Sequence, residues 1–413
     1  MNIFTCLVLS FVVAVYLIET ISDLLNLKNI SPVIPQEFEG FFDKEKYAKA
    51  QSYLKDNTKF AIFSSAFILV LQIAFIVAGG FNYINSIAVS LGFGTVLTGL
   101  AFAGILYLIC EIVDLPFLAY STFVIEEKFG FNKMNIKTFT SDFLKSLIIN
   151  GIISGAPFSV LVWLFSNIAH YAWLYAFAAI TAFELFVTFI YPIVVMPLFN
   201  KYTPLEDSEL KKSVEEYAKK ENFKMKGLFK MDNSKRSTKS NAFFTGFGRS
   251  RRIVLFDTLI QKHTAEELTS VLAHEMGHFK LGHIIKQMLL SFVSMGVMLF
   301  ILSLFINEAW LYKAFLMDAQ PVYAGVIFFA FLYAPMSFAL STISSCLSRK
   351  YEYAADAYAV TTYKHPQDMI NALKKLSVDN LSNLRPHKLK VFLEYSHPPV
   401  LDRINAIKNI SEK

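Results

Sequence analysis

Seven apolar stretches, each close to the length that crosses a lipid bilayer, constrain this chain more than any other feature. They lie near residues 3–20, 60–80, 92–119, 145–166, 171–195, 284–307 and 322–346. The first lacks the positively charged start and the cleavage site of a signal peptide, so we expect it to be a true span. Because 54% of the residues are hydrophobic and only 17% are charged, the sequence predicts a mainly α, polytopic membrane protein.

Lysine and arginine are distributed unevenly among the connections, which predicts the orientation of the chain. On one side, the connections 21–59 and 120–144 are rich in lysine, and the connection 198–283 is rich in both lysine and arginine. On the other side, 81–91 and 167–170 contain neither residue and 308–321 contains only Lys313. Since positive connections stay in the cytoplasm, we expect an outside N-terminus, with the insertion and the C-terminal tail both cytoplasmic.

This reading divides the chain into four parts, in which two water-soluble segments share one side of the membrane. The parts are an N-terminal membrane region of five spans (1–197), a cytoplasmic insertion (198–283), two further spans (284–346) and a C-terminal cytoplasmic segment (347–413). The net charge of +6 does not indicate a nucleic-acid partner, because the basic residues flank apolar runs and form no single basic domain.

The insertion combines short β-prone runs with a strongly marked helix. The runs "MKGLFKMD", "NAFFTGFG" and "RRIVLFD" predict a small sheet with a hairpin near Thr245 to Gly248. Thr264, with Glu267 three residues later, forms a capping box that begins a helix.

His274 and His278 lie one turn apart on this helix and share a face, with Glu275 beside the first. A catalytic zinc site requires this arrangement: two neutral imidazoles bind one Zn²⁺, an open position holds water, and a nearby carboxylate takes the proton of that water. The alternative is a helix with two surface histidines.

A third protein ligand is needed. The three-histidine pattern H-E-x-x-H-x-x-G-x-x-H is absent, because Leu281 and Ile284 occupy its glycine and histidine positions and His283 is displaced by one residue. Downstream, Glu352 and Asp356 lie four apart on a predicted helix just after the seventh span. We expect Glu352 to be the third ligand and Asp356 to orient a histidine or to pair with an arginine. Ordinary acidic residues on a solvated helix are the alternative.

Several long motifs occur in a characteristic order from about residue 116 to the C-terminus. They are "FVIEEKFGFNK", "SNAFFTGFGRSRRIVLFDTL", "AHEMGHFKLGH", "SRKYEYAADAYA" and "YSHPPVLDRINAI". Together they resemble the motif set of the type I CAAX prenyl endopeptidases, which are integral-membrane zinc metalloproteases of the gluzincin kind. The resemblance implies seven helices that enclose a water-filled chamber, with a cytoplasmic gluzincin-like zinc protease domain facing it.

The resemblance also implies how a substrate is held. Asn241 and Ala242 are expected on an edge strand whose free backbone groups pair with an extended peptide. Phe243 stands where many relatives are expected to have tyrosine. The implied substrates are prenylated C-a-a-X tails or, for processing or quality control, other membrane-associated proteins, in a bacterial inner membrane or an endoplasmic-reticulum membrane.

Two residues of the last motif have implied catalytic roles. His397 is expected to donate a hydrogen bond to the oxyanion formed on the scissile carbonyl, or else to be a turn histidine before two prolines. Arg403 is expected to pair with Asp356 or to polarise the substrate carbonyl, and an exposed helix arginine is the alternative.

Glu111, Asp114 and Glu184 lie within apolar spans, where a charge is costly unless it faces a cavity or a partner. We expect them to line the chamber. They also support an alternative function, a transporter or channel with a regulatory zinc site. Glu275 argues against it, because a regulatory site needs no general base.

Overall fold

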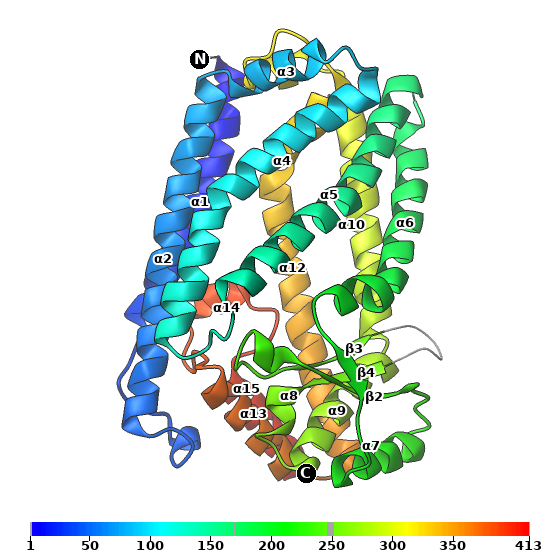
Figure 1. The fold of residues 1–413 in the computed structure, drawn as a ribbon. Coiled ribbons are helices and arrows are strands. Elements are labelled where there is room, and N and C mark those ends of the chain that lie inside the picture. The colour runs from blue at the N-terminus through cyan, green and yellow to red at the C-terminus, as the bar shows by residue number, and fades with distance from the viewer. Residues whose placement is uncertain (1, 169, 246–251, 413) are drawn as a thin grey trace.

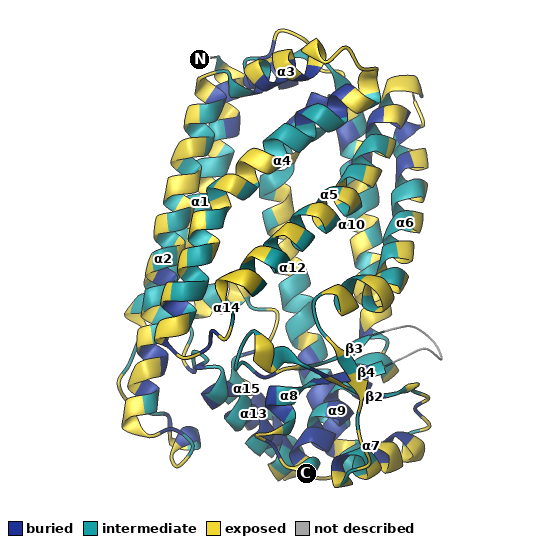
Figure 2. Ribbon diagram, in the orientation of Figure 1, coloured by how far each residue is buried: buried dark blue, intermediate teal, exposed yellow. Residues whose placement is uncertain are grey.

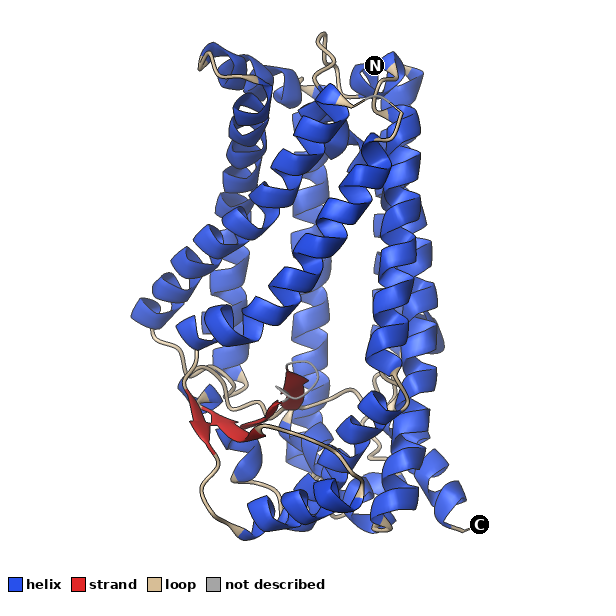
Figure 3. Cartoon of the chain, turned by 90° about the vertical axis from the view of Figure 1, so that its right-hand side faces the viewer, coloured by secondary structure: helices blue, strands red, loops and turns tan. Residues whose placement is uncertain are grey.

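The computed structural model describes residues 2–168, 170–245 and 252–412. Long helices run side by side between two ends of the molecule (Figure 1). The N-terminus lies at one end with the short helix α3 (Gly80–Ser90). The C-terminus lies at the other end with the strands and with helices α7 (Glu209–Lys220), α13 (Pro366–Asp379) and α15 (Val400–Ser411) (Figures 1 and 3). The connections predicted for opposite sides of a membrane therefore gather at opposite ends.

Seven helices within the described residues are long and apolar enough to cross a membrane. They are α1 (Ile3–Lys28), α2 (Lys44–Val77), α4 (Thr95–Tyr120) with its continuation η2 (Ser121–Glu126), α5 (Ile136–Asn167), α6 (Ala172–Ile190) with η3 (Tyr191–Val195) and η4 (Met196–Leu198), α10 (His283–Phe305) and α12 (Val322–Tyr363). Each of the seven predicted spans falls on one of these helices, which confirms a polytopic, mainly helical fold.

Neighbouring long helices are in contact in a closed ring. Going around it, α1 contacts α2, α2 contacts η2, α4 contacts α5, α5 contacts α6, α6 contacts α10, α10 contacts α12, and α12 returns to α1. Few residues of these helices are buried, and none is buried in the most apolar stretch of α6 (Figure 2). A solid bundle would bury one face of every helix.

The apolar clusters lie toward the two ends of the ring. At the N-terminal end, α3 (Gly80–Ser90) and α11 (Ala309–Ala314) pack with α1, α4 and α12 around buried Phe102, Tyr312 and Phe328. At the opposite end, one cluster joins α7 (Glu209–Lys220) to the sheet and α9, and another joins α13 and α15 to the start of α2. The protein is therefore held together most firmly at its ends.

The insertion contains a four-stranded mixed sheet with the order β1-β2-β4-β3. Its strands are β1 (Tyr202–Pro204), β2 (Gly227–Met231), β3 (Ala242–Thr245) and β4 (Arg252–Phe256). Strands β2 and β4 are parallel, while the other two pairs are antiparallel. The three predicted runs form β2, β3 and β4, and β1 was not predicted. The antiparallel β3–β4 pair agrees with the predicted hairpin, whose residues 246–248 lie outside the described residues.

Shorter helices surround the sheet and complete this end of the molecule. They are η1 (Gln36–Phe38), η5 (Asn233–Lys235), α8 (Asp257–Ile260), α9 (Ala265–Lys280), α13 (Pro366–Asp379), α14 (Lys388–Glu394) and α15 (Val400–Ser411). The predicted capping box at the start of α9 is confirmed, because Thr264 and Glu267 exchange side-chain-to-backbone hydrogen bonds of 3.1 and 3.3 Å.

Helix α12 continues without a break beyond the predicted end of the seventh span at residue 346. Its 42 residues correspond to a length of about 60 Å, twice the thickness of a bilayer core. It ends at Tyr363, and the following residue, Lys364, adopts a left-handed conformation (φ 64°). The span and the predicted ligand Glu352 therefore belong to one continuous helix, where the sequence suggested two.

Candidate active site

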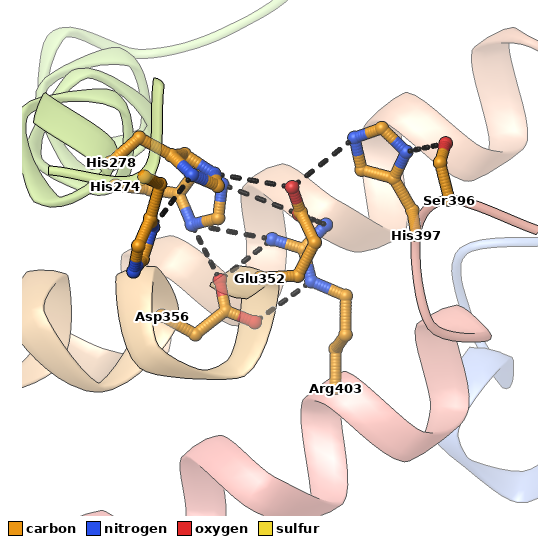
Figure 4. A network of polar contacts seen from close by, with 8 residues as sticks. His274, His278, Glu352, Asp356, Ser396, His397 and Arg403 are labelled. Carbon is orange, nitrogen blue, oxygen red and sulfur yellow. Dashed lines mark hydrogen bonds and ion pairs between the residues drawn. The ribbon is translucent and has the colours of Figure 1, made fainter. Parts of the chain in front are cut away.

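The structure brings His274, His278 and Glu352 together at the contact between α9 and α12 (Figure 4). The two Nε2 atoms of the histidines lie 3.1 Å apart. Oε1 of Glu352 lies 3.1 Å from Nε2 of His278, and Oε2 lies 3.5 Å from Nε2 of His274. One ligand atom from each residue can be chosen so that all three lie within 4.8 Å of one another. We call these three side chains the metal cradle.

A glycine allows the two helices to come so close. A Cβ atom on Gly277 would lie 3.2 Å from the Cα and carbonyl oxygen of Ala355 and 3.2 Å from Cβ of Tyr358. Such contacts are tighter than most Cβ atoms tolerate, so any larger residue would move α9 away from α12. Because Gly277 lies between His274 and His278 in α9, this glycine also sets how close the two histidines come to Glu352 on α12.

The chemistry of the metal cradle suits a cation. Glu352 is buried, and its Oε2 atom makes no hydrogen bond with the described residues. Burial alone lowers the pKa of His274, but the neighbouring Asp356 carboxylate outweighs it and raises the pKa to about 9. Two imidazoles and one carboxylate thus direct electron pairs toward one point, and their surroundings stabilise positive charge there. When the imidazoles are neutral, a divalent metal ion can supply that charge.

Asp356 and Arg403 contact the residues of the metal cradle. Oδ1 of Asp356 lies 2.7 Å from Nδ1 of His274. Arg403 donates to the same carboxylate at 2.8 Å from Nε and 2.6 Å from Nη2, while its Nη1 lies 3.4 Å from Oε2 of Glu352. Both side chains are buried, so Arg403 is not the exposed helix arginine of the alternative reading. The predicted pairing with Asp356 is present.

Glu275 and His397 are the remaining residues of the predicted catalytic set. The Glu275 side chain is half-buried, and burial raises the pKa of its carboxyl group, which also feels the charges of the cradle and of Arg403. His397, in the loop before α15, is exposed. Its Nε2 lies 3.4 Å from Oε1 of Glu352, and its Nδ1 lies 3.0 Å from the Ser396 hydroxyl. Its Nε2 therefore faces the cradle.

The other predicted residues lie on the sheet. Ala242 begins β3, which pairs only with β4 among the described residues and is therefore an edge strand. Asn241 precedes it and is exposed. The backbone carbonyl of Asn241 accepts a hydrogen bond of 3.1 Å from the backbone N–H of Phe256. The ring of Phe243 packs edge-on against Phe256 at 6.2 Å.

Sequence reasoning missed two residues of the site. Gly277 was not singled out, although a glycine inside a helix is a recognised signal of close packing. His283 was considered only as a displaced ligand, yet its Nδ1 lies 3.1 Å from Nδ1 of His278. Its position five residues beyond His278 gave no reason to expect this contact.

Comparison with known proteins places these features in one family. The family profile described as "CAAX prenyl protease N-terminal, five membrane helices" matches residues 23–201, and that of "Peptidase family M48" matches residues 204–411. The chain is 33% identical to a CAAX prenyl protease 1 homolog of Oryza sativa, over 98% of this chain and 97% of the rice protein. It is 34% identical to CAAX prenyl protease 1 of Saccharomyces cerevisiae, over 92% and 89% of the two chains. The crystal structure of S. mikatae Ste24p superimposes with a TM-score of 0.93 at 32% identity, covering 98% of this chain and 99% of the other.

Proposed function

This chain belongs to peptidase family M48, with the membrane region of the CAAX prenyl proteases, and we propose that it cleaves prenylated C-a-a-X tails at zinc held by His274, His278 and Glu352. Family membership makes it an integral-membrane metalloendopeptidase. The alternative of a transporter or channel is not supported. The observation that supports the residue assignment is the convergence of two histidines from α9 with one glutamate from α12.

The donor set fits zinc in a catalytic setting. Two imidazoles and one carboxylate are a common set of three protein ligands for catalytic zinc and leave a coordination position open. When bound, zinc supplies Lewis-acid chemistry, since it polarises the scissile carbonyl and makes a water molecule more acidic. One ion per chain is expected, because only one cluster of suitable ligands occurs among the described residues.

Glu275 is proposed as the general base. It follows the ligand His274 directly in α9 and is not one of the three side chains of the metal cradle. Burial raises the pKa of its carboxyl group, which brings it nearer to the value at which a carboxylate accepts and then releases a proton. Glu275 would take a proton from the attacking water and deliver it to the leaving amine nitrogen.

His397 and Arg403 are proposed to act on opposite sides of the cradle. His397 is exposed and directs Nε2 toward the cradle, so it can donate a hydrogen bond to the developing oxyanion. Arg403 already gives Nε and Nη2 to Asp356 and is buried. We therefore propose that Arg403 positions Asp356 and His274 and does not contact the substrate carbonyl.

Access to the site is proposed to run through the ring of helices. The low burial of the spans favours a hollow interior, because inward faces that packed on one another would be buried. An extended peptide would add to the free edge of β3 at Asn241 and Ala242, and a lipid chain would lie among apolar walls. Glu111, Asp114 and Glu184 are proposed to line this interior, where water would hydrate their carboxylate groups.

The distribution of lysine and arginine supports an outside N-terminus and a cytoplasmic active site. The proposal is the same for a bacterial inner membrane and for an endoplasmic-reticulum membrane, because positive connections stay in the cytoplasm in both.

The test uses the detergent-purified full chain with a farnesylated C-a-a-X peptide and unprenylated hydrophobic peptides, and the Glu275→Gln variant is the inactive control. We expect cleavage of the farnesylated peptide, slower cleavage of some unprenylated ones, loss of both with a zinc chelator, and recovery on adding zinc. Cleavage of unprenylated peptides alone would contradict the prenylated substrate and favour quality control. If fully metallated protein cleaves no peptide, the proposed function is wrong.

A further inference from the structure

We propose that His283 is a positioning residue for His278: its Nδ1 accepts a hydrogen bond from the Nδ1–H of His278 and thereby directs Nε2 of His278 toward the metal. The inference rests on the proposed function in one respect, that His278 binds the metal. It concerns the residue that sequence reasoning discarded as a displaced ligand.

The distances place His283 and the ligand atoms of the cradle at the two different nitrogens of the His278 ring. The two Nδ1 atoms lie 3.1 Å apart. On the other side of the His278 ring, Nε2 lies 3.1 Å from Nε2 of His274 and 3.1 Å from Oε1 of Glu352. When Nε2 gives its lone pair to a metal ion, the ring proton is on Nδ1. His283 is the acceptor of that proton, a place usually filled in metal sites by a carboxylate, a carbonyl or water.

The surroundings of His283 hold its ring in place. The side chain is buried and stacks on Tyr351 at 4.3 Å between ring centroids and 13° between planes. Tyr351 directly precedes the ligand Glu352 on α12, so His283 links α10 to both ligand-bearing helices. His283 is also the first residue of α10. A neutral ring with its proton on Nε2 can accept at Nδ1.

The backbone break between α9 and α10 makes the contact possible. On one continuous helix, side chains five residues apart point about 140° away from each other. Here α9 ends at Lys280, and Gly282 adopts a left-handed conformation (φ 67°) before α10 begins at His283. This turn directs the His283 ring back toward His278. Most other residues would be strained at Gly282.

The two histidine ligands are therefore held in place by different partners. The Nδ1 atom of His274 lies 2.7 Å from the Asp356 carboxylate, whereas Nδ1 of His278 lies 3.1 Å from the imidazole of His283. A carboxylate stabilises positive charge on its partner more strongly than an imidazole does. We infer that His283 contributes mainly by selecting the tautomer and the orientation of the His278 ring.

The experiment measures zinc affinity of the full chain in detergent by competition with a chelator. His283→Phe keeps a ring against Tyr351 but removes the acceptor, and we expect its zinc dissociation constant to rise about 10- to 100-fold. His283→Gln supplies an amide oxygen and should recover part of the affinity. His365→Phe is the matched control, because His365 also packs on a tyrosine, Tyr363, but lies between α12 and α13 away from the cradle.

Two further measurements separate positioning from a structural role. The visible absorption of the cobalt(II)-substituted protein should change in His283→Phe and stay unchanged in His365→Phe. In zinc-loaded wild type, ¹⁵N NMR of labelled histidines should show Nδ1 of His283 without a proton. This last measurement decides the matter even if His283→Phe does not fold.

Wild-type affinity and an unchanged cobalt spectrum in His283→Phe would overturn the inference, as would a protonated Nδ1 on His283. The proposed metal site is tested separately by His278→Ala. If that variant binds zinc as tightly as wild type, His278 is not a ligand and the proposed function fails at its own premise.

Discussion

Nδ1 of His274 lies 2.7 Å from Oδ1 of Asp356, and the same carboxylate accepts two hydrogen bonds from Arg403. Asp356→Asn keeps the shape of the side chain but removes its charge. We expect zinc affinity to fall about 10- to 100-fold, since the partner of a metal-binding histidine is lost. The buried Arg403 also loses its nearest counter-charge, which should lower the free energy of unfolding by about 3–5 kcal/mol. Chelator competition and thermal unfolding measure the two effects, with the exposed Asp402→Asn as control.

The second prediction concerns the proposed base. Glu275→Gln should abolish peptide cleavage while the zinc content stays near one ion per chain, because Glu275 moves protons and does not bind the metal. Glu266→Gln, at the exposed start of the same helix, should retain activity. Comparable cleavage by Glu275→Gln and wild type would overturn the mechanism.

The third prediction concerns the ligand from α12. Glu352→Ala should lose both metal and activity, because two histidines leave zinc short of its usual three protein ligands. Metal analysis of the purified variant is the measurement. Full zinc occupancy would instead assign the third position to Asp356 or to another histidine.

The fourth prediction tests the close contact of α9 and α12. In Gly277→Ala the new Cβ would meet Ala355 at 3.2 Å, so the helices must separate by a few tenths of an ångström. A displacement approaching 1 Å at a catalytic site can cost about 100-fold in rate, so we expect a loss of kcat/KM of about 10- to 100-fold. Gly104→Ala is the matched control, because a Cβ there would meet no atom within 4 Å. Equal losses in both variants would refute the packing argument.

The fifth prediction is the orientation in the membrane. Reporters fused after Lys413 and inserted near Lys211 should both report the cytoplasm, and one inserted in the connection 308–321 should report the opposite side. If the first two disagree, α9 and α15 would be on different sides of the membrane, and the site could not assemble.

The sequence by itself determined the features that depend on local pattern. Hydrophobic length is set by the thickness of a bilayer, so the seven spans could be recognised without knowing how they pack. The capping box at Thr264 and Glu267 marked the start of α9, and helical periodicity placed His274 and His278 on one face. The spacing of Glu352 and Asp356 likewise predicted that they share one face of a helix, and the need for a third ligand led us to expect them near the histidines.

Only the tertiary structure decided the relationships between elements that are distant in the chain. The continuity of α12 past residue 346 carries Glu352 to α9, and the small size of Gly277 allows the approach, but both depend on which helices meet. Arg403 was open to three readings until its burial against Asp356 was known. His283 shows the reason most plainly. Five residues of sequence separation place it away from His278 on a helix, and a left-handed turn at Gly282 brings it back, because a single backbone conformation redirects every side chain that follows it.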